Sequence, residues 1–271
     1  MSTVQSTVLI TGAAGGVGTL MRPRLARPGR VLRLLDITPL DAGPGEEVVR
    51  ASVTDLAALT EACRGADAVI HLGGKSVEAP WERILETNID GTYKVFEAAR
   101  RAGVPRVIFA SSNHAVGYHT PDEYPLSEDA PTLPDTYYGV SKVTGEALGA
   151  LYHHRYGLDV ICVRIMTCFP KPPDQRALAT WLSPDDCARL FEACLSAEKP
   201  GYRIVYGVSA NTRGGWVSLD AARELGYEPQ DDAEVFAEQF VAEQGELAPD
   251  DPLFRYLGGN FTFSRYDADN L

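Results

Sequence analysis

The feature that most constrains the fold lies near the amino end, where a short apolar run passes directly into a glycine-rich turn. The run TVLIT precedes glycines at positions 12, 15, 16 and 18, and a helix-like stretch follows at 17–25. Glycine has no Cβ, so this turn can be tight and its backbone can approach another group closely. A buried strand that turns at once into a helix opens a strand–helix–strand unit, which predicts a parallel sheet.

Apolar runs and helical patterns alternate along most of the chain. Near-continuous apolar strands between helices are typical of a parallel sheet that helices cover on both faces. Residues 246–271 have no clear periodicity. We expect strands at TVLITG, VLRLLD, EEVVRAS, DAVIHLGG, RVIFAS, LDVICVRI and RIVYGVS, and helices at 17–25, 55–63, 81–102, 137–156, 183–197, 220–225 and 233–241.

An acid at the end of the second expected strand gives the glycine turn a specific meaning. Asp36 follows the turn by about 20 residues, where a carboxylate can accept the ribose hydroxyls of a dinucleotide. Gly12, Gly15 and Gly18 would let the backbone approach a pyrophosphate, and the next helix would direct its N–H groups at it. An arginine that would hold a 2′-phosphate does not follow Asp36, so NAD is favoured over NADP. A plain glycine turn beside a surface aspartate is the weaker alternative.

These patterns predict an α/β fold, with a doubly wound Rossmann-type parallel sheet, helices on both faces and a small C-terminal substrate-binding elaboration. We expect a single domain over 1–271, with an NAD-binding core at 1–165 and a C-terminal elaboration at 166–271 that is not an independent domain. The fourth strand ends in Leu72, Gly73 and Gly74, at the edge where ligands bind in such sheets. These glycines would let the backbone lie against the cofactor, although a plain tight turn explains them equally well.

A tyrosine and a lysine point to the chemistry. Tyr138 and Lys142 are four residues apart and share one face of an expected helix. A nearby ammonium favours the phenolate and lowers the pKa of a tyrosine, which makes a base able to take an alcohol proton while hydride leaves the same carbon. A solvated helix face would show the same spacing, but the polar cluster SSNH after the fifth strand and the glycine turn accompany the pair here.

With these residues the chain resembles the short-chain dehydrogenase/reductase superfamily, in its extended-type branch. The resemblance rests on GAAGGVG, Asp36, HLGG, TNIDGT, ASSN and YGVSK, and it covers about 8–165. The segments HLGGKSVE, FASSNHAVGY, TYYGVSK, VRIMTC, RALATWLSPDD and VYGVSAN look more closely like the uronate dehydrogenase group, as far as Trp216. This resemblance implies NAD-dependent oxidation of a hexuronate, such as D-glucuronate or D-galacturonate, at C1. The product would be the aldaro-lactone, which can open to the aldarate, and no metal would be needed.

The resemblance also implies catalytic roles. Tyr138 would be the general base. Lys142 would bind the nicotinamide ribose and tune Tyr138, and Ser112 would hydrogen-bond the substrate oxygen. Asn88 in TNIDGT would support this network, though a capping or packing amide explains it equally well.

For the cofactor, the resemblance places Gly16 and Val17 against the pyrophosphate. Ser52 and Val53 stand where related sequences often have Asp-Leu against the adenine, so this contact is expected to be weaker or made by the backbone. The expected cofactor contacts are Gly12, Gly15, Gly16, Val17, Gly18, Asp36, Ser52, Val53, Leu72, Gly73, Gly74, Asn88, Lys142 and, beside the nicotinamide, Ile165.

The carboxylate of a uronate needs a local cation in a chain whose net charge is −12. Lys75, Arg164, Arg176 and Arg213 are candidates. Arg176 matches the substrate arginine of the resembled group, and a guanidinium can grip a carboxylate bidentately. The expected substrate contacts are Ser76, Ser112, Asn113, His114, Tyr138, Thr167 and Arg176. A turn cap at Ser76, a satisfied strand-end histidine at His114 and simple packing at Thr167 remain alternatives.

Composition excludes several other classes of protein. The acidic net charge, with a pI of about 4.9, gives no global attraction for nucleic acid or an anionic membrane. No run of 18 apolar residues and no signal-peptide pattern is present, so we expect a cytoplasmic protein. Five cysteines without a C-x-x-C pair predict neither a disulfide framework nor a zinc site. A homo-oligomer is expected from the resemblance alone.

Two other functions fit the same scaffold. A nucleotide-sugar epimerase or dehydratase would need room for a nucleotide diphosphate, usually from a larger C-terminal region than the roughly 100 residues that follow Ile165. A non-catalytic dinucleotide sensor would not need the tyrosine, lysine and serine together. Net NADH formation separates both from a dehydrogenase.

Overall fold

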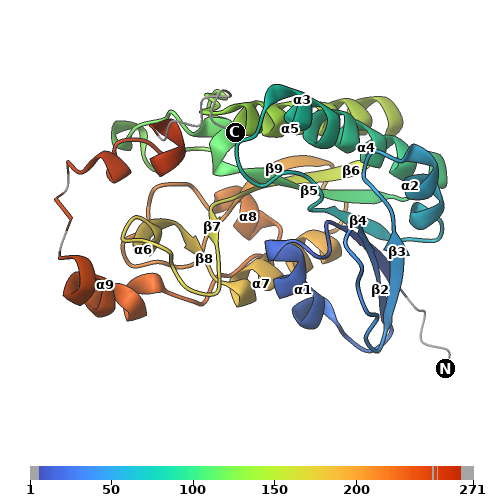
Figure 1. Ribbon diagram of the computed structural model, residues 1–271, viewed down its shortest axis with the longest axis horizontal. Coiled ribbons are helices and arrows are strands. Elements are labelled where there is room, and N and C mark those ends of the chain that lie inside the picture. Colours follow the sequence, from blue (N-terminus) through green and yellow to red (C-terminus); the bar gives the residue numbers. More distant parts are fainter. Residues whose placement is uncertain (1–5, 246, 249, 264–271) are drawn as a thin grey trace.

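A parallel sheet of seven strands forms the centre of the computed structural model, which describes residues 6–245, 247–248 and 250–263 (Figure 1). The strand order is β3-β2-β1-β4-β5-β6-β9. The order reverses between β1 and β4, which is the switch point where doubly wound sheets bind ligands. The strands are β1 (Ser6–Thr11), β2 (Arg30–Asp36), β3 (Glu46–Arg50), β4 (Ala68–His71), β5 (Arg106–Ser112), β6 (Asp159–Ile165) and β9 (Tyr202–Gly207).

Helices cover both faces of this sheet (Figure 1). One face packs against α2 (Leu56–Cys63), α4 (Gly91–Ala102) and α5 (Tyr137–Tyr156). The other packs against α1 (Gly16–Leu25), α7 (Pro184–Ser196) and α8 (Asp220–Glu224). The predicted doubly wound α/β fold is therefore confirmed, and the seventh strand comes from beyond residue 165.

Helix α5 approaches the sheet closely because two of its inward positions are glycines. A Cβ at Gly145 would overlap the ring of Phe109 in β5, and one at Gly149 would lie 2.8 Å from Cγ1 of Val160 in β6. Real Cβ atoms do not approach so closely, so larger residues would push the helix outward. These close contacts determine the distance between helix α5 and strands β5 and β6, and so the position of the first turn of α5 beside the ends of these strands.

The expected helix at 81–102 is present over these residues, but its first half is not regular α-helix. It is divided into α3 (Trp81–Arg83), a π-helical segment (Ile84–Asp90) and α4. The π segment carries Asn88, whose side chain binds the backbone after β4. Local π geometry often accompanies functional positions in helices.

Small elements build the C-terminal side of the molecule. The sequence predicted α7, α8 and β9, but not α6 (Ala177–Thr180) or the two-stranded sheet of β7 (Thr167–Cys168) and β8 (Trp181–Leu182). The expected helix at 233–241 is a 3-10 turn (Ala233–Phe236) followed by α9 (Ala237–Gln244). Other 3-10 turns are Asn113–Val116, Pro121–Glu123, Pro252–Phe254 and Gly259–Thr262.

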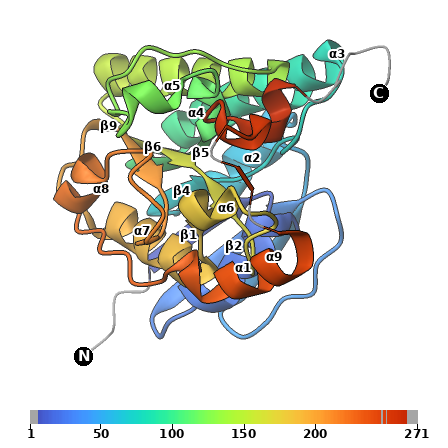
Figure 2. The same cartoon turned by 90° about the vertical axis from the view of Figure 1, so that its left-hand side faces the viewer.

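Residues 252–262, which we call the C-terminal strap, lie across the carboxyl end of the sheet. Leu257 N donates to His119 O at 2.9 Å, and Gly258 N donates to Gly117 O at 2.8 Å. Figure 2, which faces this end of the molecule, shows the strap in red between α5 and α6. The part of the chain outside the described residues comprises 1–5, 246, 249 and 264–271. These residues belong to the predicted domain, and those from 246 onward belong to its aperiodic C-terminal end.

No helix in the described part of the chain has both the length and the apolar character needed to cross a membrane.

Candidate active site

The turn after β1 packs directly against the end of β4. Gly12 has φ +71°, and a Cβ there would lie 2.7 Å from Gly73 Cα, so only glycine fits. A Cβ at Gly18 would overlap Gly12 O, which keeps α1 against the turn. Gly15 is the N-cap of α1, and it has no side chain that could accept hydrogen bonds from the first amides of the helix. A Cβ at Gly16 would meet no described atom within 4 Å. This uncapped, open helix end fits a pyrophosphate.

Asp36 stands at the end of β2, beside the same turn. Its Oδ2 accepts from Ala14 N at 2.9 Å and its Oδ1 accepts from Thr38 N at 2.9 Å. Each carboxylate oxygen keeps a further lone pair, so the group can still accept two ribose hydroxyls. Val17 is partly buried against the core beneath α1, so its side chain supports the turn.

The predicted adenine contacts, Ser52 and Val53, follow β3. The Ser52 hydroxyl hydrogen-bonds that of Thr54 at 2.8 Å. Val53 is buried, and a Cβ at Gly73 would lie 2.6 Å from its Cγ1, while one at Gly91 would lie 2.9 Å from its Cγ2. Val53 therefore lies beneath the backbone of Gly73 and supports that end of β4.

The side chain of Asn88 joins the loop after β4 to helix α5. Its Oδ1 accepts from Lys75 N at 2.7 Å, and its Nδ2 donates to Lys75 O at 2.9 Å and to Ser141 Oγ at 3.2 Å. Gly74, at φ +153°, leaves room for this amide, because a Cβ there would lie 3.1 Å from Asn88 Oδ1. These protein contacts engage both ends of the amide, so Asn88 connects the loop after β4 to helix α5.

Helix α5 begins one residue before Tyr138, and two side chains accept hydrogen bonds from the amides of its first turn. Thr136 is the N-cap and its hydroxyl accepts from Gly139 N at 3.0 Å. The buried carboxylate of Glu78 accepts from Tyr137 N at 3.1 Å and from Tyr138 N at 2.8 Å. A carboxylate at a helix N-terminus satisfies free amides and complements the helix dipole. The backbone of Tyr138 is thereby fixed beside the end of β5.

Lys142 lies one turn further along α5. Its Nζ donates to Ala110 O at 2.7 Å and stands 5.2 Å from the centroid of the Tyr138 ring. Burial lowers the pKa of the Lys142 ammonium to about 8, and the negative charge of Glu146 acts in the opposite direction. At neutral pH the side chain is therefore still mainly an ammonium.

The pKa of Tyr138 differs from the expectation that Lys142 would lower it. Burial raises the pKa of this phenol to about 12; the hydrogen bond from Ser112 lowers it, and the negative charge of Asp135 raises it. Burial outweighs the other influences because a phenolate loses more solvation than a phenol. The Ser112 hydroxyl also accepts from His114 N at 3.2 Å and lies 3.3 Å from Asn113 Oδ1. The structure thus brings Ser112, Tyr138 and Lys142 together.

Arg164 is not available to a substrate carboxylate. Its Nε and Nη2 each donate to Glu146 at 2.9 Å, and its Nη1 donates to the Tyr206 hydroxyl at 3.1 Å. Both members of this pair are buried, and Ser111 Oγ also donates to Glu146 at 2.6 Å. The pair joins β5, β6 and α5 next to the segments that carry Ser112, Tyr138 and Lys142.

Arg176 is buried beneath the C-terminal strap. Its Nη2 donates to Leu257 O, the same oxygen to which Asn113 Nδ2 donates at 3.2 Å. Its Nε has no hydrogen-bond partner among the described residues, and its guanidinium carbon lies 5.6 Å from the Trp216 ring centroid. Burial lowers the pKa of Arg176. A buried guanidinium with an unused donor is well suited to an anionic ligand.

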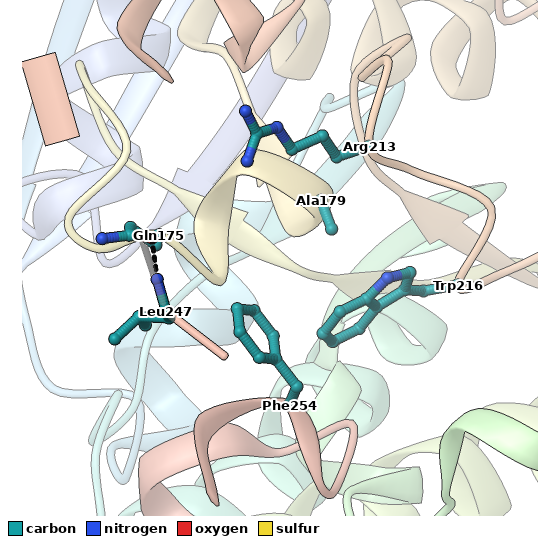
Figure 3. Close-up of a pocket in the computed structure, with 6 residues that line it drawn as sticks. All are labelled: Gln175, Ala179, Arg213, Trp216, Leu247 and Phe254. Carbon is teal, nitrogen blue, oxygen red and sulfur yellow. Dashed lines mark hydrogen bonds between the residues drawn. The ribbon is translucent and has the colours of Figure 1, made fainter. Parts of the chain in front are cut away.

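A pocket of about 140 Å³, which we call the outer pocket, has Trp216 in its lining (Figure 3). Arg213 reaches this pocket, and it also donates to Glu234 at 2.8 and 3.1 Å. Gln175 Oε1 accepts from Leu247 N at 3.1 Å across the pocket (Figure 3). Arg213 therefore belongs to this outer pocket rather than to the group around Tyr138. The lining residues are Gln175, Ala179, Arg213, Trp216, Leu247 and Phe254.

The remaining predicted contacts are less closely tied to the site. Leu72 and Ile165 are partly buried at the ends of β4 and β6 and pack on one core cluster. Ser76 is exposed on the loop after β4. The hydroxyl of Thr167 hydrogen-bonds that of Thr180 at 2.8 Å, which joins β7 to α6.

Sequence reasoning missed three parts of the site: Glu78, Asp135 and the strap. Asp135 Oδ2 lies 2.7 Å from His114 Nδ1, and Phe261 of the strap stacks on His114 with ring centroids 4.0 Å apart. An acid directly before the N-cap residue was the only available signal for Asp135, and an aperiodic segment gave none for the strap. No group of three or more His, Cys, Asp or Glu that could hold a metal ion occurs in the described ranges.

Comparisons with known proteins show which family the chain is similar to. The model of the NAD dependent epimerase/dehydratase family matches residues 8–183. A uronate dehydrogenase of Pseudomonas putida is 46% identical over 94% of this chain and 94% of that protein. A glucuronic acid dehydrogenase from Chromohalobacter salexigens has a TM-score of 0.92 at 43% identity, over 98% of this chain and 99% of that one. A mutant uronate dehydrogenase from Agrobacterium tumefaciens, complexed with NAD, has a TM-score of 0.90 at 43% identity, over 95% and 97%.

Proposed function

This chain belongs to the NAD dependent epimerase/dehydratase family, and on that premise we propose that it oxidises a hexuronate at C1 with NAD as the cofactor. Its similarity to uronate dehydrogenases extends over nearly its whole length. The observation that carries the proposal is the position of Arg176 and Asn113, which meet at Leu257 O beside the group of Ser112, Tyr138 and Lys142.

The residues around the switch point fit NAD. The open N-terminus of α1 would hold the pyrophosphate, and Asp36 would accept the ribose hydroxyls. Lys142 would donate to the nicotinamide ribose. Bound NAD supplies the acceptor for the hydride that leaves C1.

The protein residues handle the proton. Tyr138 takes the proton of the C1 hydroxyl while the C1–H bond breaks with its electron pair, and a C1=O bond forms. Ser112 would donate its one hydroxyl hydrogen to the substrate oxygen, and the ammonium of Lys142 would stabilise the Tyr138 phenolate. When the substrate is a ring, this oxidation gives the aldaro-lactone, which opens in water to the aldarate.

Arg176 would bind the substrate carboxylate. Its unpartnered Nε–H and its buried position favour an anion as the ligand. Asn113 and His114 would contact sugar hydroxyls from the turn after β5. Ser76 and Thr167 are the more peripheral proposed contacts, because one is exposed and the other is bonded to Thr180.

The strap argues against a nucleotide-sugar epimerase or dehydratase. Leu257 is fully buried, and its backbone bonds both Arg176 and Asn113 on the substrate side. A nucleotide diphosphate attached to the sugar would need space beyond these residues. The complete Ser112, Tyr138 and Lys142 group likewise argues against a sensor without activity.

NADH formation from a panel of sugars tests this function. D-Glucuronate and D-galacturonate should each give net NADH, while UDP-glucose should not. Glucose 6-phosphate and L-arabinose complete the panel, because one carries a different anion and the other carries none. Net NADH from neither uronate would refute the proposal, and turnover of UDP-glucose without net NADH would favour an epimerase.

We also propose that residues 1–271 work as one cytoplasmic unit and form a homo-oligomer. Tyr93, Leu151 and Tyr156 are exposed on α4 and α5, and an interface between copies would cover them. Light scattering at several protein concentrations measures the oligomer directly.

A further inference from the structure

The carboxylate of Asp135 is buried between two segments that form the active site. Its side chain is completely buried, and its Oδ2 lies 2.7 Å from His114 Nδ1. Its other oxygen, Oδ1, accepts from the Thr136 hydroxyl at 2.9 Å. The carboxylate thus joins the turn after β5 to Thr136, the N-cap residue of α5.

Two glycines make room for this carboxylate. A Cβ at Gly117 or at Gly258 would overlap Asp135 Oδ2. Gly117 lies in the turn after β5, and Gly258 lies in the strap. Any larger residue at either position would displace the oxygen that faces His114. The backbone on both sides is therefore shaped around Asp135.

The ring of His114 is fixed by its other neighbours as well. Phe261 stacks on it at a centroid distance of 4.0 Å, and the Tyr138 ring stands edge-on to it at 5.6 Å. With its plane set by these rings, the imidazole keeps Nδ1 on Asp135 and directs Nε2 away from it. A carboxylate only accepts hydrogen bonds, so Nδ1 carries a proton, and in the neutral ring Nε2 presents a lone pair.

We propose that Asp135 is a positioning residue that fixes the ring orientation and tautomer of His114, so that Nε2 accepts a hydrogen bond from a substrate hydroxyl. This inference rests on the proposed function, because it requires a polyhydroxylated substrate. It assigns Asp135 no contact with the substrate. A sugar that lacks this hydroxyl would leave the buried Nε2 of His114 without a hydrogen-bond partner. The Asp135–His114 pair therefore also contributes to specificity for the sugar.

The variant Asp135→Asn tests this role because the structure fixes how the new amide must lie. The Thr136 hydroxyl donates to Oδ1, so the amide oxygen stays there and the amide nitrogen takes the position of Oδ2. That nitrogen donates to His114 Nδ1 and moves the ring proton to Nε2. Loss of the correct histidine tautomer through an aspartate-to-asparagine change is known from serine proteases.

We expect Asp135→Asn to raise the KM for the uronate about tenfold or more, with the KM for NAD unchanged. The chain also contains a matched control. His119 Nδ1 lies 2.7 Å from Glu123 Oε2, which is a second histidine–carboxylate pair, but with an exposed carboxylate. Glu123→Gln should leave both KM values unchanged. Unfolding temperatures of both variants show whether a change follows from lost stability.

Nitrogen NMR of the histidine rings, without substrate, provides a readout that does not depend on turnover. His114 should carry its proton on Nδ1 in the wild-type protein and on Nε2 in Asp135→Asn. An unprotonated Nδ1 in the wild type would overturn the inference. Equal increases in the KM for uronate and NAD, together with a lowered unfolding temperature, would reduce Asp135 to a structural residue. If the wild type oxidises no uronate, the proposed function fails, and the NMR comparison still decides the positioning role.

Discussion

The Lys142 ammonium lies 5.2 Å from the ring centroid of Tyr138, and the two groups have pKa values that burial shifts in opposite directions. The lysine value falls to about 8 and the tyrosine value rises to about 12. Because two such neighbouring groups titrate together, the pair loses its first proton at a pH near the lower of the two pKa values, that of Lys142. The form that has lost one proton includes the phenolate–ammonium arrangement, which is the one that can take a proton from an alcohol.

The pH dependence of kcat/KM follows from this pair. For the wild-type protein we expect kcat/KM for the uronate to rise with pH until the first proton is lost, at about pH 8. In Lys142→Met only the phenol remains, with its pKa near 12, so the rising limb should move up by roughly four pH units. A rising limb that stays in place would show that Tyr138 is not the group that titrates.

Replacement of Arg176 tests the carboxylate site. Arg176→Lys keeps a charge but loses the planar guanidinium, and the KM for uronates should rise by about 30-fold or more while the KM for NAD stays constant. Arg213→Ala is the control, since Arg213 lines the outer pocket and pairs with Glu234. Steady-state kinetics with each substrate varied in turn measures this. A larger effect for Arg213→Ala would place the carboxylate in the outer pocket.

Gly259 in the strap tests whether the strap positions Arg176. Gly259 has φ +58°, and a Cβ there would lie 2.7 Å from Arg176 Nε. Gly65 has φ +68°, but a Cβ there would meet no described atom within 4 Å. Both Gly→Ala variants should lose about 1–2 kcal/mol of unfolding free energy from backbone strain.

Only Gly259→Ala should also raise the KM for uronates, because only there does the new methyl group displace the guanidinium. Urea unfolding and uronate kinetics on the two variants give both values. A normal KM in Gly259→Ala would mean that the strap lies over the site without holding Arg176.

Several of these features could be predicted from the sequence. The glycine turn, Asp36 and the Tyr138–Lys142 pair are local patterns with fixed spacing, and the alternating apolar runs determine the sheet. The sequence could not show that Asp135, Glu78 and Leu257 O meet the site, because these contacts join segments far apart in the chain. The expected lowering of the Tyr138 pKa was wrong, because burial raises it and burial is a property of the packed structure. The roles assigned to individual site residues stay predictions.

The buried pair of Glu146 and Arg164 should contribute to stability rather than to binding. Glu146→Leu leaves Arg164 as an unpaired buried charge, so the free energy of unfolding should fall by about 3–5 kcal/mol. Replacing both residues, with Arg164→Met, should recover most of that loss. The exposed pair of Glu61 and Arg64 is the control, and Glu61→Ala should change stability by less than about 1 kcal/mol. Equal losses in the two single variants would contradict this account.

The most direct test of the central claim follows the hydrogen at C1. D-Glucuronate deuterated at C1 is incubated with NAD and the wild-type protein, and the mass of the reduced cofactor is measured, with Tyr138→Phe as the parallel sample. We predict that the wild type transfers one deuterium to the cofactor, and that Tyr138→Phe does so about 10²–10⁴ times more slowly. Reduced cofactor without deuterium, or an unchanged rate in Tyr138→Phe, would contradict hydride transfer from C1 with Tyr138 as the base.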